Sequence, residues 1–157
     1  MACAVVLDLD DTLWTCDGGC VSFLTLPFTR VSEDTLRDAR GRLLHLRPDA
    51  RSLLDELRDR GVVVSIASFN LPHHALHALR ALGLGDRFFR PQIATISKRE
   101  MLRRLHLSLQ RVGIGYQGMI FVDDDPKNVL LARALGITVL CLGRDIHSLA
   151  DVRGYLM

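Results

Sequence analysis

Two groups of aspartates are the residues whose types and spacing point most directly to chemistry. The groups are Asp8, Asp10 and Asp11, and the consecutive residues Asp123, Asp124 and Asp125. The apolar run from residue 4 to 9 ends in the first group, and the run 118–122 leads into the second. Short apolar runs of this kind are typical of strands buried on both faces. Carboxylates that gather at strand ends repel one another, and a hard divalent cation such as Mg²⁺ relieves that repulsion. The sequence therefore predicts an anionic cradle for a metal ion.

The elements that must position these acids alternate between strands and amphipathic helices. The expected strands are 4–9, 62–67, 93–96, 118–122 and 137–142, and the expected helices are 49–61, 72–83, 97–109, 126–135 and 147–156. This alternation predicts right-handed crossovers and a parallel sheet covered on both faces. We expect an α/β fold, a Rossmann-like three-layer sandwich around a central parallel sheet, formed by one domain over residues 1–157.

The segment between the first strand and the first clear helix is less regular. Residues 13–31 carry turn-forming glycines and a proline around an apolar patch and predict a small hairpin or flap, whereas residues 32–44 show a weak helical pattern. We assign residues 13–47 to a minimal flap or cap insertion. A segment of this length is too short for a large cap domain, so the crevice at the strand ends should be open enough for bulky substrates.

Composition narrows the functional classes. The chain has 157 residues, of which 48% are hydrophobic and 24% charged, as expected of a soluble globular domain. A net charge of +2 makes nucleic acid an improbable partner. There is no apolar run of the ~20 residues that span a bilayer, so no membrane partner is expected.

Cys16 and Cys20 are either free thiols or a redox pair, and the cysteine usage favours a cytoplasmic location. The pair His73 and His77 has a spacing that can bind zinc, although a solvated helix face explains it more simply.

Further polar residues fall where ligands collect in an open parallel sheet, beyond the carboxyl ends of the strands. Ser68 follows the second expected strand, and Lys98 follows Ser97, a candidate N-cap residue. Lysine is rare in this chain: its 20 basic residues include only Lys98 and Lys127 besides arginines. An ammonium and a guanidinium are not interchangeable against a phosphoryl group, which makes Lys98 a candidate functional residue.

These motifs resemble a known family. The stretch Asp8-Leu9-Asp10-Asp11-Thr12 resembles the DxDxT signature of haloacid-dehalogenase-type (HAD) phosphohydrolases. The superfamily's other motifs have counterparts in the right order, in Ser68, Lys98 and the pair Asp123-Asp124. The sequence is most similar to the small magnesium-dependent phosphatases of this superfamily, over nearly the whole chain except residues 15–44.

The resemblance implies a Mg²⁺-dependent phosphatase acting on phosphomonoesters, with a role for each matched residue. Asp8 would be the nucleophile that forms an aspartyl-phosphate, and Asp10 the general acid and then base. Ser68 and Lys98 would hold the phosphoryl oxygens. The implied metal ligands are Asp8, Asp123, Asp124 (directly or through water) and the backbone carbonyl of Asp10.

The resemblance also implies supporting residues around this core of the site. Thr12 and Asn128 would support the geometry, and the backbone N–H groups of Leu9 to Asp11 would meet phosphate. Phe69 stands where related phosphatases often carry a polar or basic residue, and Asn70 can replace part of that role. We group Phe69 and Asn70 with the phosphate-binding residues.

Two readings outside catalysis remain open. A phosphoacceptor signalling domain also uses acids, a Ser or Thr, a Lys and Mg²⁺ on a parallel sheet, but it carries its phosphoacceptor on a middle strand of the sequence, whereas here the DxD motif follows the first. A binding or regulatory protein that has lost activity would not be expected to keep the complete motif set. Phosphotyrosine in a protein and sugar phosphates are both candidate substrates, and the oligomeric state is open.

Overall fold

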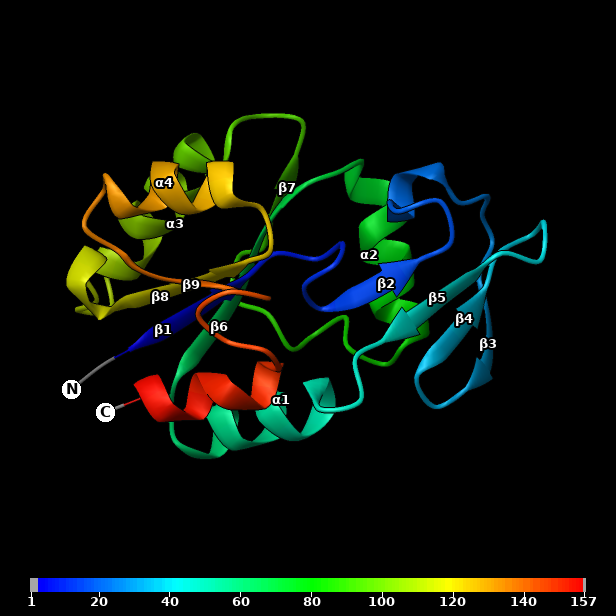
Figure 1. Cartoon of the computed structure of the whole chain (residues 1–157), viewed down its shortest axis with the longest axis horizontal. Coiled ribbons are helices and arrows are strands. Elements are labelled where there is room, and N and C mark those ends of the chain that lie inside the picture. Colours follow the sequence, from blue (N-terminus) through cyan, green and yellow to red (C-terminus); the bar gives the residue numbers. More distant parts are fainter. Residues whose placement is uncertain (1–2, 157) are drawn as a thin grey trace.

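The computed structural model describes residues 3–156, and its centre is a five-stranded parallel sheet in the order β7-β6-β1-β8-β9 (Figure 1). The strands are β1 (Ala4–Leu7), β6 (Val63–Phe69), β7 (Gln92–Ala94), β8 (Met119–Asp123) and β9 (Thr138–Cys141). All four residues of β1 are completely buried, as expected for the central strand of a sheet covered on both faces. Val5 of β1 pairs with Val64 on one side and with Ile120 on the other. The predicted parallel sheet is confirmed.

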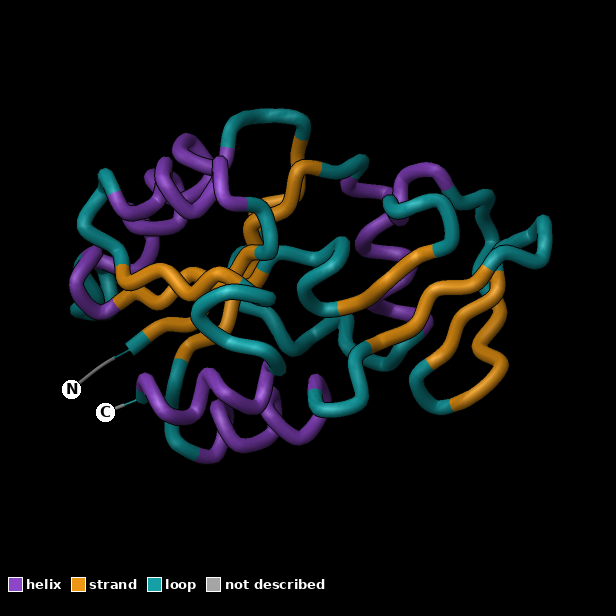
Figure 2. Tube along the Cα trace, in the orientation of Figure 1, coloured by secondary structure: helices purple, strands orange, loops and turns teal. Residues whose placement is uncertain are grey.

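Helices cover both faces of this sheet, as Figure 2 shows. The α-helices are α1 (Ala50–Asp59), α2 (Pro72–Ala81), α3 (Lys98–Gln110) and α4 (Pro126–Arg133), and short 3-10 helices span Val21–Phe23, Tyr116–Gly118 and Leu149–Tyr155. Val5 and Leu7 pack into one core with α1, α2 and the last 3-10 helix, whereas Ala4 and Val6 pack into a second core with α3 and α4. Successive strand residues face opposite ways, so β1 supplies both cores. The three-layer sandwich is confirmed. No helix within residues 3–156 has the length and apolar character needed to cross a bilayer.

A second, antiparallel sheet lies beside the α/β core, at the right of Figure 1. Its strands are β2 (Trp14–Cys16), β3 (Thr29–Ser32), β4 (Thr35–Arg37) and β5 (Leu43–Leu46), in the order β2-β5-β4-β3. The expected helix over residues 32–44 is therefore wrong. Burial alternates along β5, where Leu44 and Leu46 are buried and His45 is exposed, and that period of two belongs to a strand. The assignment of residues 13–47 as an insertion into one domain stays a prediction.

The turn between β4 and β5 is organised by one buried carboxylate, that of Asp38. It accepts hydrogen bonds from the backbone N–H groups of Thr25, Arg40 and Arg42 at 2.7 to 2.9 Å, and from the Arg42 guanidinium at 3.1 Å. Burial alone would raise the pKa of Asp38, but these donors outweigh burial and lower the pKa to about 2.

Replacing Asp38 by Asn should lower the free energy of unfolding by roughly 1–3 kcal/mol at neutral pH, because donors aimed at a carboxylate lose their charged acceptor. A folded-state pKa below the unfolded value makes Asp38 stabilise the fold above about pH 4, and that contribution shrinks as the pH falls toward 2. Urea titrations between about pH 7 and 3 should therefore show the wild type and the variant converging at acid pH. A difference that stays constant or widens in acid would contradict this account.

Candidate active site

The candidate site lies where the three middle strands of the sheet end. Asp8 directly follows β1, Ser68 is the penultimate residue of β6, and Asp123 is the last residue of β8. After β1 the chain builds one side of the sheet with β6 and β7 and then crosses to the other side with β8 and β9. The strand order therefore reverses next to β1, which is where ligand sites form in open α/β sheets.

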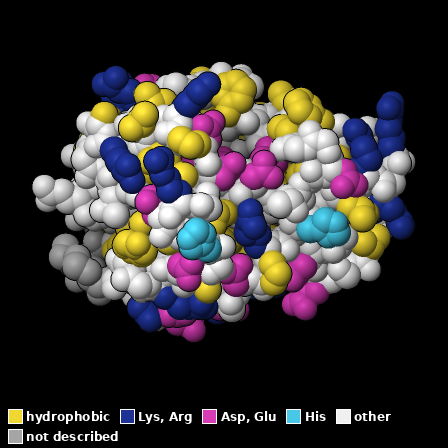
Figure 3. Space-filling view, in the orientation of Figure 1, with side chains coloured by type: hydrophobic (Ala, Val, Ile, Leu, Met, Phe, Trp, Pro, Cys, Tyr) yellow, Lys and Arg dark blue, Asp and Glu magenta, His cyan; other side chains and the backbone are white. Residues whose placement is uncertain are grey.

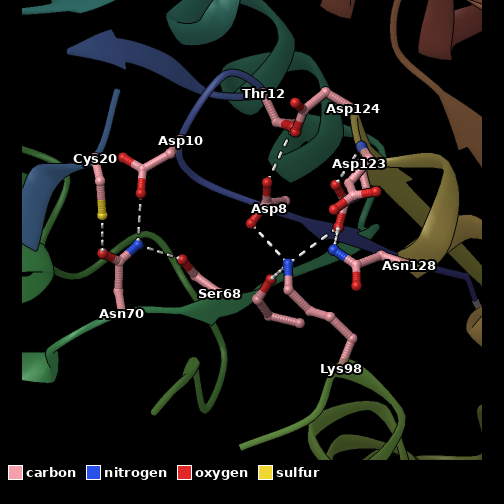
Figure 4. A network of polar contacts seen from close by, with 12 residues as sticks. Asp8, Asp10, Thr12, Cys20, Ser68, Asn70, Lys98, Asp123, Asp124 and Asn128 are labelled. Atoms are coloured by element: carbon pink, nitrogen blue, oxygen red, sulfur yellow. Dashed lines mark hydrogen bonds and ion pairs between the residues drawn. The ribbon is translucent and has the colours of Figure 1, made fainter. Parts of the chain in front are cut away.

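The ammonium group of Lys98 contacts two of the acids, Asp8 and Asp123 (Figure 4). Its Nζ donates to Asp8 Oδ1 at 2.7 Å, to Asp123 Oδ2 at 3.0 Å and to the carbonyl oxygen of Ala67 at 2.7 Å. Lys98 is the first residue of α3, and the helix start is fixed by Ser97, whose hydroxyl accepts from the Glu100 N–H. The lysine side chain is only 4% exposed, so its charge is neutralised by these protein groups rather than by water.

Three carboxylates share this place with one ammonium. Burial raises the pKa of Asp8 to about 7, with the charge of Asp123 adding to the rise and Lys98 opposing it. Burial and the charge of Asp123 likewise raise the pKa of Asp124. Burial would lower the pKa of Lys98, but the two carboxylates it contacts outweigh burial and raise it. With all acids ionised, the cluster carries an excess of negative charge that favours a bound cation.

The donor set fits Mg²⁺. Asp8, Asp123 and Asp124 each offer a carboxylate oxygen, and these three oxygens lie within 4.8 Å of one another. Bonds of about 2.1 Å place opposite ligands of an octahedral Mg²⁺ about 4.2 Å apart, so small side-chain movements bring the three oxygens around one ion. An all-oxygen, anionic donor set is typical of this hard cation and unlike the nitrogen and sulfur ligands that zinc prefers.

Hydrogen bonds hold the ligand oxygens in place. Thr12 Oγ1 lies 3.3 Å from Asp8 Oδ2 and 3.2 Å from Asp124 Oδ1, so one hydroxyl touches both acids. Asn128 donates to Asp123 Oδ2 at 3.1 Å, and the Asp125 N–H donates to Asp123 Oδ1 at 2.9 Å. Asp123 thus has acceptor contacts on both oxygens. The cluster is preorganised by the protein around it.

Asp10 belongs to a second group of side chains, which faces the antiparallel sheet (Figure 4). Its Oδ1 accepts from the Trp14 indole N–H at 2.9 Å and from the Val21 N–H at 3.0 Å. Its Oδ2 accepts from Asn70 Nδ2 at 2.9 Å, and the same amide nitrogen donates to Ser68 Oγ at 2.7 Å. Asn70 is therefore the bridge between Asp10 and the serine at the end of β6.

The loop that carries Asp8 and Asp10 is fixed through its backbone. Asp11 has a positive φ of 62°, a conformation that few residues other than glycine adopt, although aspartate and asparagine tolerate it. Arg47 donates to the carbonyl oxygens of Asp11 and Thr12, at 2.7 Å in each case. An arginine from the end of the antiparallel sheet thus holds the positive-φ turn that directly follows the two catalytic candidates, Asp8 and Asp10.

The predicted site residues fall into three sets in the structure. The residues gathered around the acid cluster are Asp8, Thr12, Lys98, Asp123, Asp124 and Asn128; those on the adjoining side are Asp10, Ser68 and Asn70. The third set has side chains outside these networks. The Leu9 side chain lies in the core, Asp11 is exposed, and Phe69 is 59% exposed. The Asp11 N–H donates to the Trp14 carbonyl oxygen at 2.7 Å, so a phosphate contact through it would have to replace that bond, whereas a phosphate contact of Leu9 must come from its backbone. Asp125 accepts from the Lys127 N–H as the N-cap of α4.

Several contacts were missed from the sequence. Trp14 belongs to none of the predicted motifs, yet its indole N–H donates to Asp10 Oδ1. The signal was present, because a buried tryptophan usually needs an acceptor and Asp10 is four residues away. The Arg47 side chain donates to backbone carbonyl oxygens, and Lys98 donates to the Ala67 carbonyl oxygen. No side-chain motif predicts such contacts with backbone groups.

Comparison with known proteins identifies the family of this chain. A family model described as Acid Phosphatase matches residues 1–148. The chain belongs to this family. Among curated relatives of this acid phosphatase family member is human "Magnesium-dependent phosphatase 1", which is 32% identical over 149 residues, covering 93% of this chain and 82% of the relative. The predicted resemblance to HAD-type phosphatases is confirmed.

Solved structures agree on the fold of this acid phosphatase family member. A HAD-superfamily hydrolase from Geobacter sulfurreducens superposes with a TM-score of 0.70 at 17% identity, covering 99% of this chain and all of that one. The N-terminal part of a Bacteroides fragilis protein, described as containing a phosphatase domain complexed with Mg, gives a TM-score of 0.65 at 19% identity over 92% of this chain. The present chain spans only 37% of that second structure.

Proposed function

We propose that this acid phosphatase family member is a Mg²⁺-dependent phosphomonoester hydrolase that works through an aspartyl-phosphate on Asp8. The observation that carries the proposal is the setting of Asp8. The Asp8 carboxylate is buried, and its Oδ1 lies 2.7 Å from Lys98 Nζ. It also has an oxygen within 4.8 Å of carboxylate oxygens of Asp123 and Asp124. A carboxylate placed beside both a cation site and a fixed ammonium can approach a phosphate dianion. The human relative named as magnesium-dependent supports the choice of metal.

Catalysis requires one new bond and one broken bond at phosphorus. An Asp8 oxygen attacks phosphorus, the ester P–O bond breaks, and an aspartyl-phosphate remains. A bound Mg²⁺, held by Asp8, Asp123 and Asp124, would offset the repulsion between carboxylate and phosphate. Lys98 donates to Asp8, Asp123 and the Ala67 carbonyl, so binding a phosphoryl oxygen would replace one of these bonds, and its charge would stabilise the transition state. Ser68 lies on the adjoining side, next to Asn70, and would bind a second phosphoryl oxygen.

Proton transfer is assigned to Asp10. Its Oδ1 accepts two N–H donors, from Trp14 and Val21, whereas Oδ2 accepts one, from Asn70, so we assign the proton to Oδ2. Protonated Oδ2 donates to the leaving oxygen and afterwards takes a proton from the water that attacks the aspartyl-phosphate. That attack releases inorganic phosphate and restores the Asp8 carboxylate. The aspartate two residues after the nucleophile thus serves both half-reactions.

A phosphoacceptor domain without turnover is the alternative, and it differs in one observable. It would accumulate a long-lived phosphorylated form and release little inorganic phosphate. Phosphotyrosine-bearing proteins and sugar phosphates are both retained as substrate classes, and a cytoplasmic location stays a prediction.

Metal removal tests the proposal. With a panel of sugar phosphates, nucleotides and phosphotyrosine or phosphoserine peptides, we expect phosphate release in Mg²⁺, loss of nearly all activity in EDTA, and full recovery when Mg²⁺ is returned in excess. The cause is the uncompensated negative charge of the Asp8, Asp123 and Asp124 cluster. Release of phosphate that continues undiminished in EDTA would overturn the metal requirement. Stable phosphorylation without release would favour the phosphoacceptor alternative.

A further inference from the structure

A hollow beside the candidate site has a wall of exposed apolar side chains. It has a volume of about 350 Å³ and is lined by Cys20, Ser22, Phe23, Phe69, Asn70, Leu71 and Thr95. Phe23 is 65% exposed, Phe69 59% and Leu71 46%, which is unusual for such large apolar residues. They come from the 3-10 helix Val21–Phe23 and from the end of β6 and the residues after it. In Figure 3, hydrophobic side chains lie next to the acidic group near the centre of the view.

Most polar side chains in this wall are already paired with the protein. Asn70 Oδ1 accepts from the Ser22 hydroxyl at 2.5 Å and from the Cys20 thiol at 3.2 Å. Ser22 Oγ in turn accepts from the Leu71 N–H at 2.9 Å, and Asn70 Nδ2 donates to Asp10 and Ser68. The hydroxyl of Thr95, an exposed residue, is the remaining polar side-chain group of the lining.

The hollow is continuous with the catalytic groups through Asn70. This side chain lines the hollow and also contacts Asp10, the residue to which we assign protonation of the leaving oxygen. The hollow with the wall of Phe69, Phe23 and Leu71 therefore begins one side chain away from Asp10 Oδ2. Ser68 and Phe69 are consecutive in β6, and their side chains point to opposite faces. The end of β6 therefore supplies one residue to the phosphoryl group and the next residue to the wall of the hollow.

We propose that this hollow is the leaving-group subsite and that it selects phosphomonoesters whose alcohol is a hydrocarbon rather than a polyol. The inference rests on the proposed function and deepens it. A hydrocarbon chain gains by covering the three exposed apolar side chains, since burial of apolar surface is favourable. A polyol gains little, because its hydroxyl groups lose water and meet a wall whose polar side chains, except Thr95, are paired within the protein. Among the described residues that line the hollow there is no charged side chain to recognise an ionic alcohol.

Two pairs of esters of the same alcohol class test this selectivity. Hexyl phosphate and glycerol 3-phosphate are both esters of primary alcohols, and 2-naphthyl and phenyl phosphate are both aryl esters. Glycerol is the more acidic of the two primary alcohols, so leaving-group reactivity favours the polyol and opposes the expected preference for hexyl phosphate. We expect kcat/KM for hexyl phosphate to exceed that for glycerol 3-phosphate by at least ~10-fold, with a smaller preference for naphthyl over phenyl. Both members of each pair carry the same phosphate charge, so the metal and Lys98 act equally on both.

Variants of the wall locate the selectivity. Phe23→Ala and Leu71→Ser should each lower kcat/KM for hexyl phosphate by roughly 5-fold or more and leave glycerol 3-phosphate within about 2-fold of the wild type. Both side chains are largely exposed, so the fold should tolerate their loss. Leu107→Ala is the matched control, because Leu107 is 64% exposed on α3 and lies outside the hollow.

The outcomes separate the two proposals. Hydrolysis of hexyl phosphate and glycerol 3-phosphate at equal kcat/KM would overturn the subsite while leaving the phosphatase intact. Selectivity that survives both Phe23→Ala and Leu71→Ser would overturn its assignment to this wall. Failure to hydrolyse any of the four esters in Mg²⁺ would overturn the proposed function, and the subsite with it.

Discussion

Replacing Asp8 by Asn should lower kcat by at least about 10⁴-fold, because the amide cannot form the acyl-phosphate bond on which turnover depends. The loss should be the same for aryl and alkyl phosphates, since both need the same nucleophile. Phosphate release under saturating substrate measures it directly. Retention of even a few per cent of the wild-type kcat would show that Asp8 is not the nucleophile.

The Asp8→Asn variant should nevertheless fold. Asparagine has the shape of aspartate, and Lys98 keeps its contacts with Asp123 and with the Ala67 carbonyl. Burial raises the pKa of Asp8, so a neutral amide at this position avoids the cost of a desolvated charge. Thermal unfolding should show a melting temperature no lower than that of the wild type. Asp86→Asn, which makes the same change at an exposed position, is the matched control and should keep full activity.

Lys98 should be the residue whose loss damages both stability and catalysis. Lys98→Met leaves the Asp8 and Asp123 carboxylates buried without their ammonium, and breaking a buried ion pair in this way costs about 3–5 kcal/mol. Lys98→Arg keeps the charge but must fit a larger planar group into a site where the side chain is 4% exposed. We expect Lys98→Arg to lower kcat by about 10²-fold, the usual effect of losing one fixed donor at a transferring group.

Lys127 provides the matched comparison. It is the other lysine of the chain, and it is exposed in the first turn of α4. Lys127→Arg should leave kcat and the urea midpoint unchanged, because a solvated cation at that position can be exchanged without steric cost. Equal effects of arginine at positions 98 and 127, on either kcat or stability, would contradict a specific role for Lys98.

The α/β core was predictable because its signals are local. Apolar runs such as Ala4 to Leu7 and the helix start at Ser97 follow from residue type and spacing, and parallel strands then bring their carboxyl ends together. That reasoning placed Asp8 and Asp123 at one sheet edge, and the structure joins both to Lys98, which is 90 residues from Asp8 in the sequence. The motif order supplied this third partner, whereas periodicity alone could not.

The segment between residues 13 and 47 was less predictable for physical reasons. Strands of three or four residues, such as β4 and β5, are too short to show a clear period, so the pattern of residues 32–44 predicts a weak helix instead. Pairing between distant segments decides such structure, and the sequence does not reveal the partner. The hydrogen bonds from Trp14 and Val21 to Asp10 depend on that pairing and were missed with it.

The central claim is that phosphate passes through a covalent bond to Asp8, and trapping that bond tests it most directly. Wild-type protein is mixed with Mg²⁺ and hexyl phosphate or an aryl phosphate, quenched in acid within the first turnover, and reduced with borohydride, which converts an aspartyl-phosphate into homoserine. Peptide mass spectrometry then locates the modified residue. We predict homoserine at position 8, dependent on both substrate and Mg²⁺. Homoserine at Asp10, Asp123 or Asp124 instead, or turnover with no homoserine at any position, would contradict the account.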